Sequence, residues 1–317
     1  MNQLPFYTRL TLRLAAGVER LDDEYRRRVA AFLWSTQNET GGFVGRKGDA
    51  DIYYTSFALR SLGLLGEPFG PEIGDYLTQT IENVDKKPLS GFSGIELISL
   101  LFCTQLWSVF SGQNLFETKT DWPIRQLERF RCDDGGYASS EKTKFSSTYH
   151  TFLVLGLLEH IAPDLLPEAE TLRVFLARRQ KKDGGFVELK PLKNSGTNPT
   201  VAGIGLLSFL RNRFGESLDE QFDKAFRFLR QRQLPQSGFQ ANGKIPAADL
   251  LSTFTALSVF IDNDRTDSMD ISSAYDFVRG LQRMENDRIG YVGGPWDKEP
   301  DVEYTFYGLA AECLMGR

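Results

Sequence analysis

A motif recurs along this chain, and its clearest copy is Phe175-Leu-Ala-Arg-Arg-Gln-Lys-Lys-Asp-Gly-Gly-Phe186. A helical stretch reaches a glutamine, and after a few polar residues a pair of glycines is followed by an aromatic side chain. Glycine adopts the left-handed backbone conformation at little cost, so we expect the glycine pair to end the helix. The aromatic side chain is then expected to pack back under that helix. A single copy of this motif is typical of an ordinary turn.

The motif is repeated at near-constant spacing, which gives it more weight than any single copy has. Further copies end at Phe43, Tyr137, Phe239 and Tyr291, and a degenerate second copy reads Ser90-Gly-Phe92. Successive aromatics are about 45 to 53 residues apart. A fixed period of this length is the signature of a repeat architecture, so the sequence predicts six units.

Each copy is followed by a second stretch that is more apolar than the first. Val201-Ala-Gly-Ile-Gly-Leu-Leu-Ser-Phe-Leu210 is one example. A helix that is apolar nearly all round belongs inside a protein, whereas a first stretch such as Ala225-Phe-Arg-Phe-Leu-Arg-Gln-Arg-Gln233 carries charge on one face and belongs outside. No polar capping repeat is evident at either end. We therefore predict an all-α fold, a closed α/α toroid or double-ring barrel of six helical hairpins around a central apolar cavity.

The composition agrees with one large repeat domain. The chain has 317 residues, of which 41% are hydrophobic and 25% charged, which is ordinary for a globular protein with a large core. We expect a single toroid over residues 29–317 and an N-terminal helical segment, residues 1–28, packed on the ring. The net charge of -5 argues against nucleic acid as a partner.

The sequence also bears on location. Arg9 and Arg13 interrupt the apolar N-terminus and leave no signal-peptide core. No apolar run approaches the ~18 residues needed to span a bilayer, so no transmembrane segment is expected. The three cysteines, Cys103, Cys132 and Cys313, have no CxxC spacing. This is typical of a reducing compartment, so a cytoplasmic location is predicted.

With its repeats established, the chain resembles the prenyltransferase and squalene-cyclase superfamily, whose Gln-x-x-x-Gly-Gly-Phe repeats build an α/α toroid. The resemblance covers roughly residues 29–317 and is strongest to protein prenyltransferase β subunits of the Rab geranylgeranyl type. Ser35-Thr-Gln-Asn-Glu-Thr-Gly-Gly-Phe43 and Arg230-Gln-Arg-Gln-Leu-Pro-Gln-Ser-Gly-Phe239 carry it. It implies an isoprenoid or isoprenoid diphosphate as ligand and a separate helical α-type subunit as protein partner.

The resemblance also implies a zinc site, and there the sequence departs from the family. The family holds zinc with an Asp-x-Cys pair and a later histidine. Here Asp249 is retained, but Leu251 stands at the cysteine position and Tyr304 at the histidine position. Leucine cannot bind a metal, and a thiolate is a large part of what holds zinc. We therefore predict no metal site and no cofactor, with Asp249 as the only retained ligand-position residue.

Polar and aromatic residues near the start of each inner helix are expected to converge on the rim of the cavity. The candidates for substrate binding are Asp51, Tyr53, Tyr54, Tyr149, Lys244, Asp249 and Tyr304. Lys244 stands near the position where the family's diphosphate pocket has an Arg and a Lys, and Thr197 and Asn198 stand where it has a histidine. Ser, Thr, Asp and Asn before a helix have an alternative role as N-caps.

The catalytic candidates are Glu303, Asp301 and His150. Asp301-Val-Glu303-Tyr304-Thr305 resembles the Asp-x-Asp-Asp-Thr motif of class II terpene cyclases, whose middle acid protonates an alkene or epoxide. Burial in an apolar pocket favours the protonated carboxyl by raising its pKa, so Glu303 is the predicted acid and Asp301 its neighbour. Aromatic side chains on inner helices, among them Phe306, are candidates for stabilising a carbocation. His150 is a pocket histidine or an acid–base group.

Three functions remain open from the sequence. The first is an isoprenoid-binding protein of prenyltransferase β-subunit type without zinc-dependent transfer. The second is a class II terpene cyclase-like enzyme that protonates a polyprenyl substrate through Glu303. The third is a non-catalytic scaffold that binds a protein. The fold alone cannot choose among them, because function depends on the site.

Overall fold

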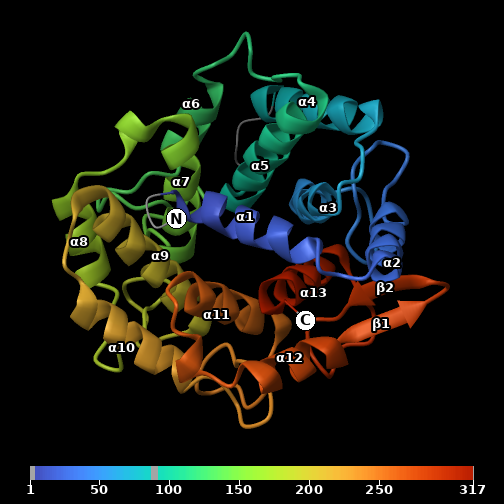
Figure 1. Cartoon of the computed structure of the whole chain (residues 1–317). Coiled ribbons are helices and arrows are strands. Elements are labelled where there is room, and N and C mark those ends of the chain that lie inside the picture. The colour runs from blue at the N-terminus through green and yellow to red at the C-terminus, as the bar shows by residue number, and fades with distance from the viewer. Residues whose placement is uncertain (1–3, 87–91, 317) are drawn as a thin grey trace. The chain divides into compact units, whose positions relative to one another are not determined.

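The computed structural model describes residues 4–86 and 92–316, and these residues form thirteen α-helices and one two-stranded hairpin (Figure 1). They group into two compact units. The first unit comprises Met1–Leu14, Arg131–Ser139 and Thr143–Gly280, and the second comprises Ala15–Phe130, Ser140–Lys142 and Leu281–Arg317. Ser90 and Gly91 of the degenerate second motif lie outside the described residues. The predicted boundary at residue 28 stays a prediction.

The first unit consists of helical hairpins in which a strongly buried helix alternates with an amphipathic one. Its buried helices are α7 (Thr148–Ile161), α9 (Thr197–Phe214) and α11 (Leu250–Asp262). Its amphipathic helices are α8 (Ala169–Ala177), α10 (Asp219–Arg230) and α12 (Ile271–Gly280). α9 packs against both α7 and α11, so the three buried helices lie side by side. The unit also holds most of α1 (Phe6–Val18) and the short 3-10 helices Pro163–Leu165 and Thr266–Ser268.

The second unit repeats this alternation. Its buried helices are α3 (Ile52–Leu64), α5 (Gly94–Ser111) and α13 (Val302–Met315), and α3 packs against the other two. Its outer helices are α2 (Asp23–Trp34), α4 (Pro71–Lys86) and α6 (Trp122–Glu128). Strands β1 (Gln282–Glu285) and β2 (Arg288–Tyr291) form an antiparallel hairpin in which Gln282 pairs with Tyr291. Asn286 and Asp287 both have positive φ, as a two-residue hairpin turn requires.

A buried threonine explains why the motif and the following helix keep their spacing. The Thr200 hydroxyl accepts a hydrogen bond from the backbone N–H of Phe186 at 2.9 Å and donates one to the carbonyl of Gly196 at 2.6 Å. It therefore ties the aromatic residue of the motif to the start of α9. The same acceptor role recurs at Thr55, Thr151, Thr253 and Thr305. Each of these is a buried residue in the first turn or two of its helix.

The glycine pairs do not end helices, so that part of the sequence analysis was wrong. α8 ends at Ala177, and Gly184 lies in a turn between Gln180 and Phe186, whose backbones pair. Gly184 has a φ of 89°, and a Cβ there would lie 2.3 Å from the carbonyl oxygen of Lys224. The glycine therefore makes a reverse turn against the next outer helix. The Gln180 side chain supports this turn by donating to the Gly184 carbonyl at 3.1 Å.

Among the described residues, α5 is the one helix whose length and composition would allow it to span a bilayer. Half of this helix is buried, and its neighbours include α3, α4 and α6. A capping box between Ser93 and Glu96 fixes its start. These are the properties of a core helix, and no clear membrane span is present in this part of the chain.

Candidate functional site

Glu303 lies in the first turn of α13, and two tyrosines hold its carboxylate. The Tyr53 hydroxyl donates to Glu303 Oε1 at 2.7 Å, and the Tyr307 hydroxyl donates to the same oxygen at 3.3 Å. Burial raises the pKa of Glu303, the Tyr53 hydrogen bond lowers it, and the nearby Asp301 carboxylate raises it again. The net shift is upward from the ordinary value. A carboxyl in this setting keeps its proton to a higher pH than an exposed glutamate does.

Asp301 precedes Glu303 and has a different role. Its carboxylate caps α13 by accepting a hydrogen bond from the backbone N–H of Tyr304 at 2.9 Å. The other carboxylate oxygen accepts from Nε of Arg46 at 3.1 Å, and Arg46 also pairs with Asp297. Burial raises the pKa of Asp301, whereas its hydrogen bonds and the Arg46 charge lower it. Asp301 is therefore a buried, ion-paired cap beside the candidate acid.

Aromatic rings surround the tyrosines that hold Glu303. The ring of Phe57 lies 5.0 Å from that of Tyr53 and 5.3 Å from that of Tyr307, both edge to face. Phe306 packs beside Phe57 at 5.5 Å. The Arg60 guanidinium lies 4.0 Å from the centroid of the Phe306 ring, so this ring already makes a cation–π contact within the chain. This contact weakens the sequence-based suggestion that Phe306 stabilises a carbocation.

Three further candidates complete this group in the second unit. Asp51 caps the start of α3 with a 2.6 Å hydrogen bond to a backbone N–H. The Tyr54 ring lies against Gly45 and the Tyr304 ring against Gly293, so closely that a Cβ on either glycine would clash. Burial raises the pKa of Tyr54, and the nearby carboxylates raise it further. Asp51, Tyr53, Tyr54 and Tyr304 therefore lie near Asp301 and Glu303, at the starts of α3 and α13.

A second polar group lies at the start of α7 in the first unit. The Ser147 hydroxyl accepts from the backbone N–H of His150 at 2.9 Å, lies 2.9 Å from Nδ1 of His150 and donates to Oε1 of Glu188. A hydroxyl has one proton and two acceptor positions. With Glu188 ionised, the serine proton goes to Glu188, so Nδ1 of His150 must carry the proton. Nε2 is then the unprotonated ring nitrogen.

Burial sets the charge of this second group. It lowers the pKa of His150 to about 4, so the imidazole is neutral at physiological pH. Burial also raises the pKa of Glu188, and the hydrogen bond from Ser147 opposes that rise. A proton that arrives at Nε2 can pass through Ser147 to Glu188. The proton then neutralises a buried carboxylate instead of leaving a buried imidazolium, which would be the more costly state.

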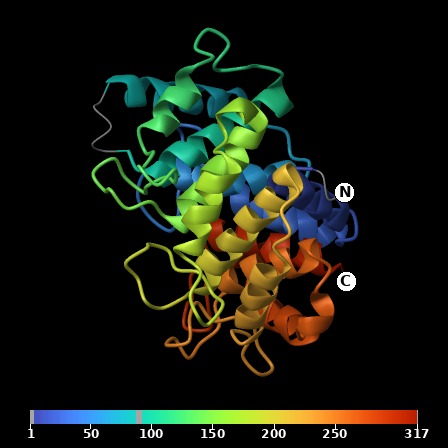
Figure 2. The same ribbon diagram turned by 90° about the vertical axis from the view of Figure 1, so that its left-hand side faces the viewer.

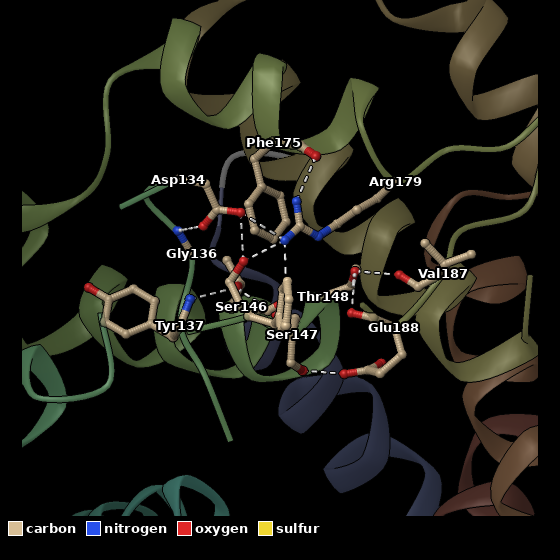
Figure 3. Close-up of polar contacts among 12 residues, drawn as sticks. Asp134, Gly136, Tyr137, Ser146, Ser147, Thr148, Phe175, Arg179, Val187 and Glu188 are labelled. Atoms are coloured by element: carbon tan, nitrogen blue, oxygen red, sulfur yellow. Dashed lines mark hydrogen bonds and ion pairs between the residues drawn. The ribbon is translucent and has the colours of Figure 1, made fainter. Parts of the chain in front are cut away.

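A buried ion pair between Arg179 and Asp134 lies next to the Ser147–His150–Glu188 group (Figure 3). Arg179 is fully buried, and its guanidinium donates to Asp134 at 3.0 Å and to the Ser146 carbonyl at 3.2 Å. The guanidinium also lies 3.4 Å from the centroid of the Phe175 ring. Burial lowers the pKa of Arg179, although its partners raise it. Because Ser146 adjoins Ser147, the Arg179 contacts fix the backbone at the start of α7.

The remaining candidates of the first unit are Tyr149, Lys244 and Asp249. Tyr149 packs edge to face on His150, with ring centroids 5.8 Å apart. Lys244 is exposed, and its backbone N–H donates to the Asn242 side chain at 2.9 Å. Asp249 caps α11 and accepts two hydrogen bonds from Ser252, at 2.7 and 2.8 Å. Burial raises the pKa of Asp249.

The residues at the family's zinc positions do not fit the metal. Asp249 already uses both carboxylate oxygens for its helix cap, Leu251 has no donor atom, and the Tyr304 ring packs on a glycine. Among residues 4–86 and 92–316, no three His, Cys, Asp or Glu side chains are grouped so as to hold a metal ion.

A cavity of about 230 Å³ lies elsewhere in the first unit, between the N-terminal segment, α7 and α9. Its lining includes Phe6, Phe152 and Phe209 on the apolar side and Glu159 and Arg213 on the polar side. Burial raises the pKa of Glu159 to about 7, although Arg9 and Arg213 lower it. None of the predicted site residues lines this cavity.

The structure adds five functional candidates that the sequence analysis missed: Arg46, Arg60, Arg179, Glu188 and Tyr307. Tyr307 could have been found, because it lies four residues after Glu303 and therefore on the same helix face. Arg46 and Glu188 act through partners far away in the sequence, 255 and 41 residues respectively. No local pattern marks such contacts.

Comparisons with known proteins bear on the fold. A model of a protein family described as the prenyltransferase alpha-alpha toroid domain matches residues 3–95 and 124–317. No curated protein matches the sequence. Among solved structures, protein geranylgeranyltransferase-I of Candida albicans, complexed with GGPP, aligns with a TM-score of 0.67 and 15% identity over 90% of each chain.

Other similar structures have different chemistries. The type II terpene cyclase MstE from Scytonema, as a variant with geranylgeranyl dihydroxybenzoate as substrate, aligns with a TM-score of 0.59 and 14% identity over 98% of each chain. An inactive variant of an α-1,6-mannanase from Salegentibacter, with α-1,6-mannotriose, also has a TM-score of 0.59, with 15% identity over 92% of this chain and 98% of its own. At these identities the likeness shows the fold alone.

Proposed function

Since the chain belongs to the prenyltransferase alpha-alpha toroid domain family, we propose that it binds an isoprenoid and starts its cyclisation by protonating it with Glu303. The observation that carries this proposal is the setting of Glu303. Its carboxyl is partly buried, its pKa is raised, and two tyrosine hydroxyls fix one of its oxygens beside a group of aromatic rings. A protonating acid needs a persistent proton, a fixed position and an apolar neighbourhood.

The proposed step balances without a further reactant. The Glu303 O–H bond breaks, and the proton forms a C–H bond at one carbon of a terminal alkene, which leaves a carbocation on the other carbon. A second alkene of the same chain attacks that carbocation and closes a ring. Loss of a proton to a base removes the positive charge of the carbocation and gives a product that is an isomer of the substrate, with the same charge. The rings of Tyr53 and Tyr307, which hold Glu303, stabilise positive charge during these steps.

Two observations favour this reaction over zinc-dependent transfer. The first is the donor set, since Leu251 and Tyr304 stand at two of the three zinc positions and Asp249 is committed to a helix cap. The second is that the acid group is assembled from α3 and α13 within one unit. Structural neighbours supply the first substrates to test, because one is a protein geranylgeranyltransferase and another binds geranylgeranyl dihydroxybenzoate.

Incubation of the purified chain with geranylgeranyl diphosphate or geranylgeranyl dihydroxybenzoate, followed by mass spectrometry of the products, tests the proposal. We expect a cyclic isomer of unchanged mass. The Glu303→Gln variant keeps the shape of the side chain but has no acidic proton, so the rate should fall by about 100-fold or more. Glu299→Gln is the matched control, because Glu299 is an exposed acid near the start of the same helix.

The outcomes separate binding from catalysis. Unchanged turnover in Glu303→Gln would remove Glu303 as the acid. Tight binding of the isoprenoid without any product would contradict the cyclase and leave an isoprenoid-binding protein. Absence of both binding and turnover, with a subunit that co-purifies, would favour the non-catalytic scaffold.

A further inference from the structure

Three successive loops of the first unit each expose a large apolar side chain. Phe145, Leu192 and Ile245 are 53%, 46% and 43% exposed, although most large apolar residues of this unit are buried. Each lies between the aromatic residue of the repeat motif and the start of the next buried helix, which is α7, α9 or α11 in turn. Single exposed apolar residues are common on proteins. Three in the corresponding loops of consecutive repeats, six to eight residues after the motif aromatic, call for an explanation.

The loops that carry these residues are neighbours in space. The backbone N–H of Thr148 donates to the carbonyl of Glu188 at 2.9 Å, which joins the first loop to the second. The backbone N–H of Thr197 donates to the carbonyl of Ala241 at 2.8 Å, which joins the second loop to the third. The loops that precede α7 and α9 project to the left in Figure 2. Phe145, Leu192 and Ile245 therefore stand on three neighbouring loops that are joined in sequence by backbone hydrogen bonds, and we call this set of loops the loop face.

The loop face is also positively charged. Lys144, Lys190, Lys193 and Lys244 adjoin the three apolar residues in the sequence, and all four are exposed. None of them has an ion pair among residues 4–86 and 92–316. The stretches 143–147, 189–196 and 241–248 contain no Asp or Glu, and the exposed Glu141, four residues before Phe145, is paired with Arg129. The whole chain has a net charge of -5, so the charge of these four lysines is opposite in sign to that of the chain.

We propose that the loop face docks the protein on an anionic lipid membrane, with Phe145, Leu192 and Ile245 inserted among the headgroups and the four lysines against the lipid phosphates. Apolar tips flanked by lysines combine the two attractions that hold a peripheral protein on such a surface. A protein partner would be expected to cover one continuous apolar patch. Here each apolar tip stands on a separate loop beside its own lysine. The proposal does not depend on the role of Glu303.

Co-sedimentation of the full chain with vesicles tests this docking. The vesicles are phosphatidylcholine alone, or phosphatidylcholine with about one third phosphatidylserine. We expect binding to the anionic vesicles only, and weaker binding at high salt. Replacing the four lysines by glutamine should lower binding by about fivefold for each lysine, and thus by more than about 100-fold together. Phe145→Ser, Leu192→Ser and Ile245→Ser combined should lower it by about tenfold or more.

A matched control comes from the opposite ends of the same helices. Ile161, Leu165 and Phe214 are exposed apolar residues of the same unit, at or just after the C-terminal ends of α7 and α9. Their combined replacement by serine should leave vesicle binding unchanged, and circular dichroism of every variant checks that it is folded. Equal binding to both kinds of vesicle, or equal losses in the control variant, would overturn the proposal. So would absence of vesicle binding, and if the loop variants then lost a co-purifying protein, the loop face would be a protein interface.

Discussion

At the scale of single residues, the polar side chains at the starts of α3, α7, α11 and α13 have two separate roles. Asp51, Ser147, Asp249 and Asp301 are N-caps, and their oxygens accept orphan backbone N–H groups. The side chains two or three residues further on are not needed for capping. Glu303 and His150 occupy such positions. Glu303 meets the distant Tyr53 directly, whereas His150 reaches the distant Glu188 only through the cap residue Ser147. The sequence shows which residues begin a helix but not which partners they meet.

The Tyr53→Phe substitution tests how the site tunes Glu303. The Tyr53 hydroxyl stabilises the ionised carboxylate and so lowers the pKa of Glu303. Its removal should raise that pKa further and extend the protonated form to higher pH. The alkaline limb of the pH–rate profile should move to higher pH. If the protein shows no turnover, a carbon NMR titration of the Glu303 carboxyl should show the raised pKa. A downward shift would contradict this account. Tyr54→Phe is the control, since no hydrogen bond joins Tyr54 to Glu303.

His150 should stay neutral through the physiological range. Burial lowers its pKa to about 4, and the contact with Ser147 places its proton on Nδ1 while Glu188 is ionised. The chain has two histidines, so nitrogen NMR of a His160→Gln variant reports on His150 alone. We expect the Nδ1–H tautomer near pH 7.5. An Nε2–H tautomer would show that the Ser147 proton points to the imidazole instead.

The same shift makes folding stability depend on pH. The pKa of His150 is lower in the folded state than the ordinary value of 6.5, so the unfolded chain binds the proton more strongly. His150 therefore makes its full contribution to the unfolding free energy above pH 6.5, and this contribution is lost as the pH falls from 6.5 toward 4. The loss amounts to about 3 kcal/mol in all. Urea unfolding at several pH values should show a smaller loss in His150→Gln, and equal losses would contradict the shift.

At the scale of elements, the repeat is held by backbone geometry more than by its visible motif. The conspicuous glycines make a reverse turn, as at Gly184, and the helix before them ends earlier. The less conspicuous threonine of the next helix joins the two halves of the hairpin. Sequence periodicity was enough to predict the alternation of buried and amphipathic helices. It did not show the threonine, because that residue is polar and lies in an otherwise apolar stretch.

The Thr200→Val substitution measures how much the hydrogen bond between the Phe186 N–H and the Thr200 hydroxyl stabilises the fold. Valine keeps the shape of threonine but leaves the buried N–H of Phe186 without an acceptor. A buried unsatisfied donor costs about 1–3 kcal/mol of unfolding free energy. Thr200→Ser keeps the hydroxyl and loses one methyl group, which should cost about 1 kcal/mol. Urea denaturation of both variants compares the two, and a serine variant less stable than the valine variant would show that packing matters more than the hydrogen bond.

At the scale of the whole molecule, membership of the toroid family follows from patterns spread over the entire chain, so it could be predicted. The site could be predicted only in part. Candidate residues such as Glu303 and Tyr53 could be named from the sequence because each is near the start of an inner helix. Arg46 and Glu188 lie in loops whose partners are set by how the hairpins pack. Neither propensity nor spacing records that packing.

The N-terminal helix gives one further test at this scale, because it meets a helix some 250 residues away in the sequence. Arg9 donates to both carboxylate oxygens of Asp262 in α11, at 2.9 and 2.6 Å, and both side chains are buried. Arg13 lies 3.8 Å from the same carboxylate. Breaking a buried pair leaves one charge uncompensated, which costs about 3–5 kcal/mol.

The two partners of this pair should not be equivalent. Asp262→Asn leaves the buried Arg9 with only Glu159 nearby, whose pKa burial raises to about 7, whereas Arg9→Met leaves Asp262 with the cation Arg13 still nearby. We therefore expect Asp262→Asn to lower the unfolding free energy more than Arg9→Met does, as measured by urea denaturation. In an Arg13→Gln background the difference should shrink, because Asp262 then loses its second cation. If Arg9→Met lowered the unfolding free energy more than Asp262→Asn, the uncompensated charge of Arg9 would not be the main cost of breaking the pair. The first helix would then be held mainly by apolar contacts.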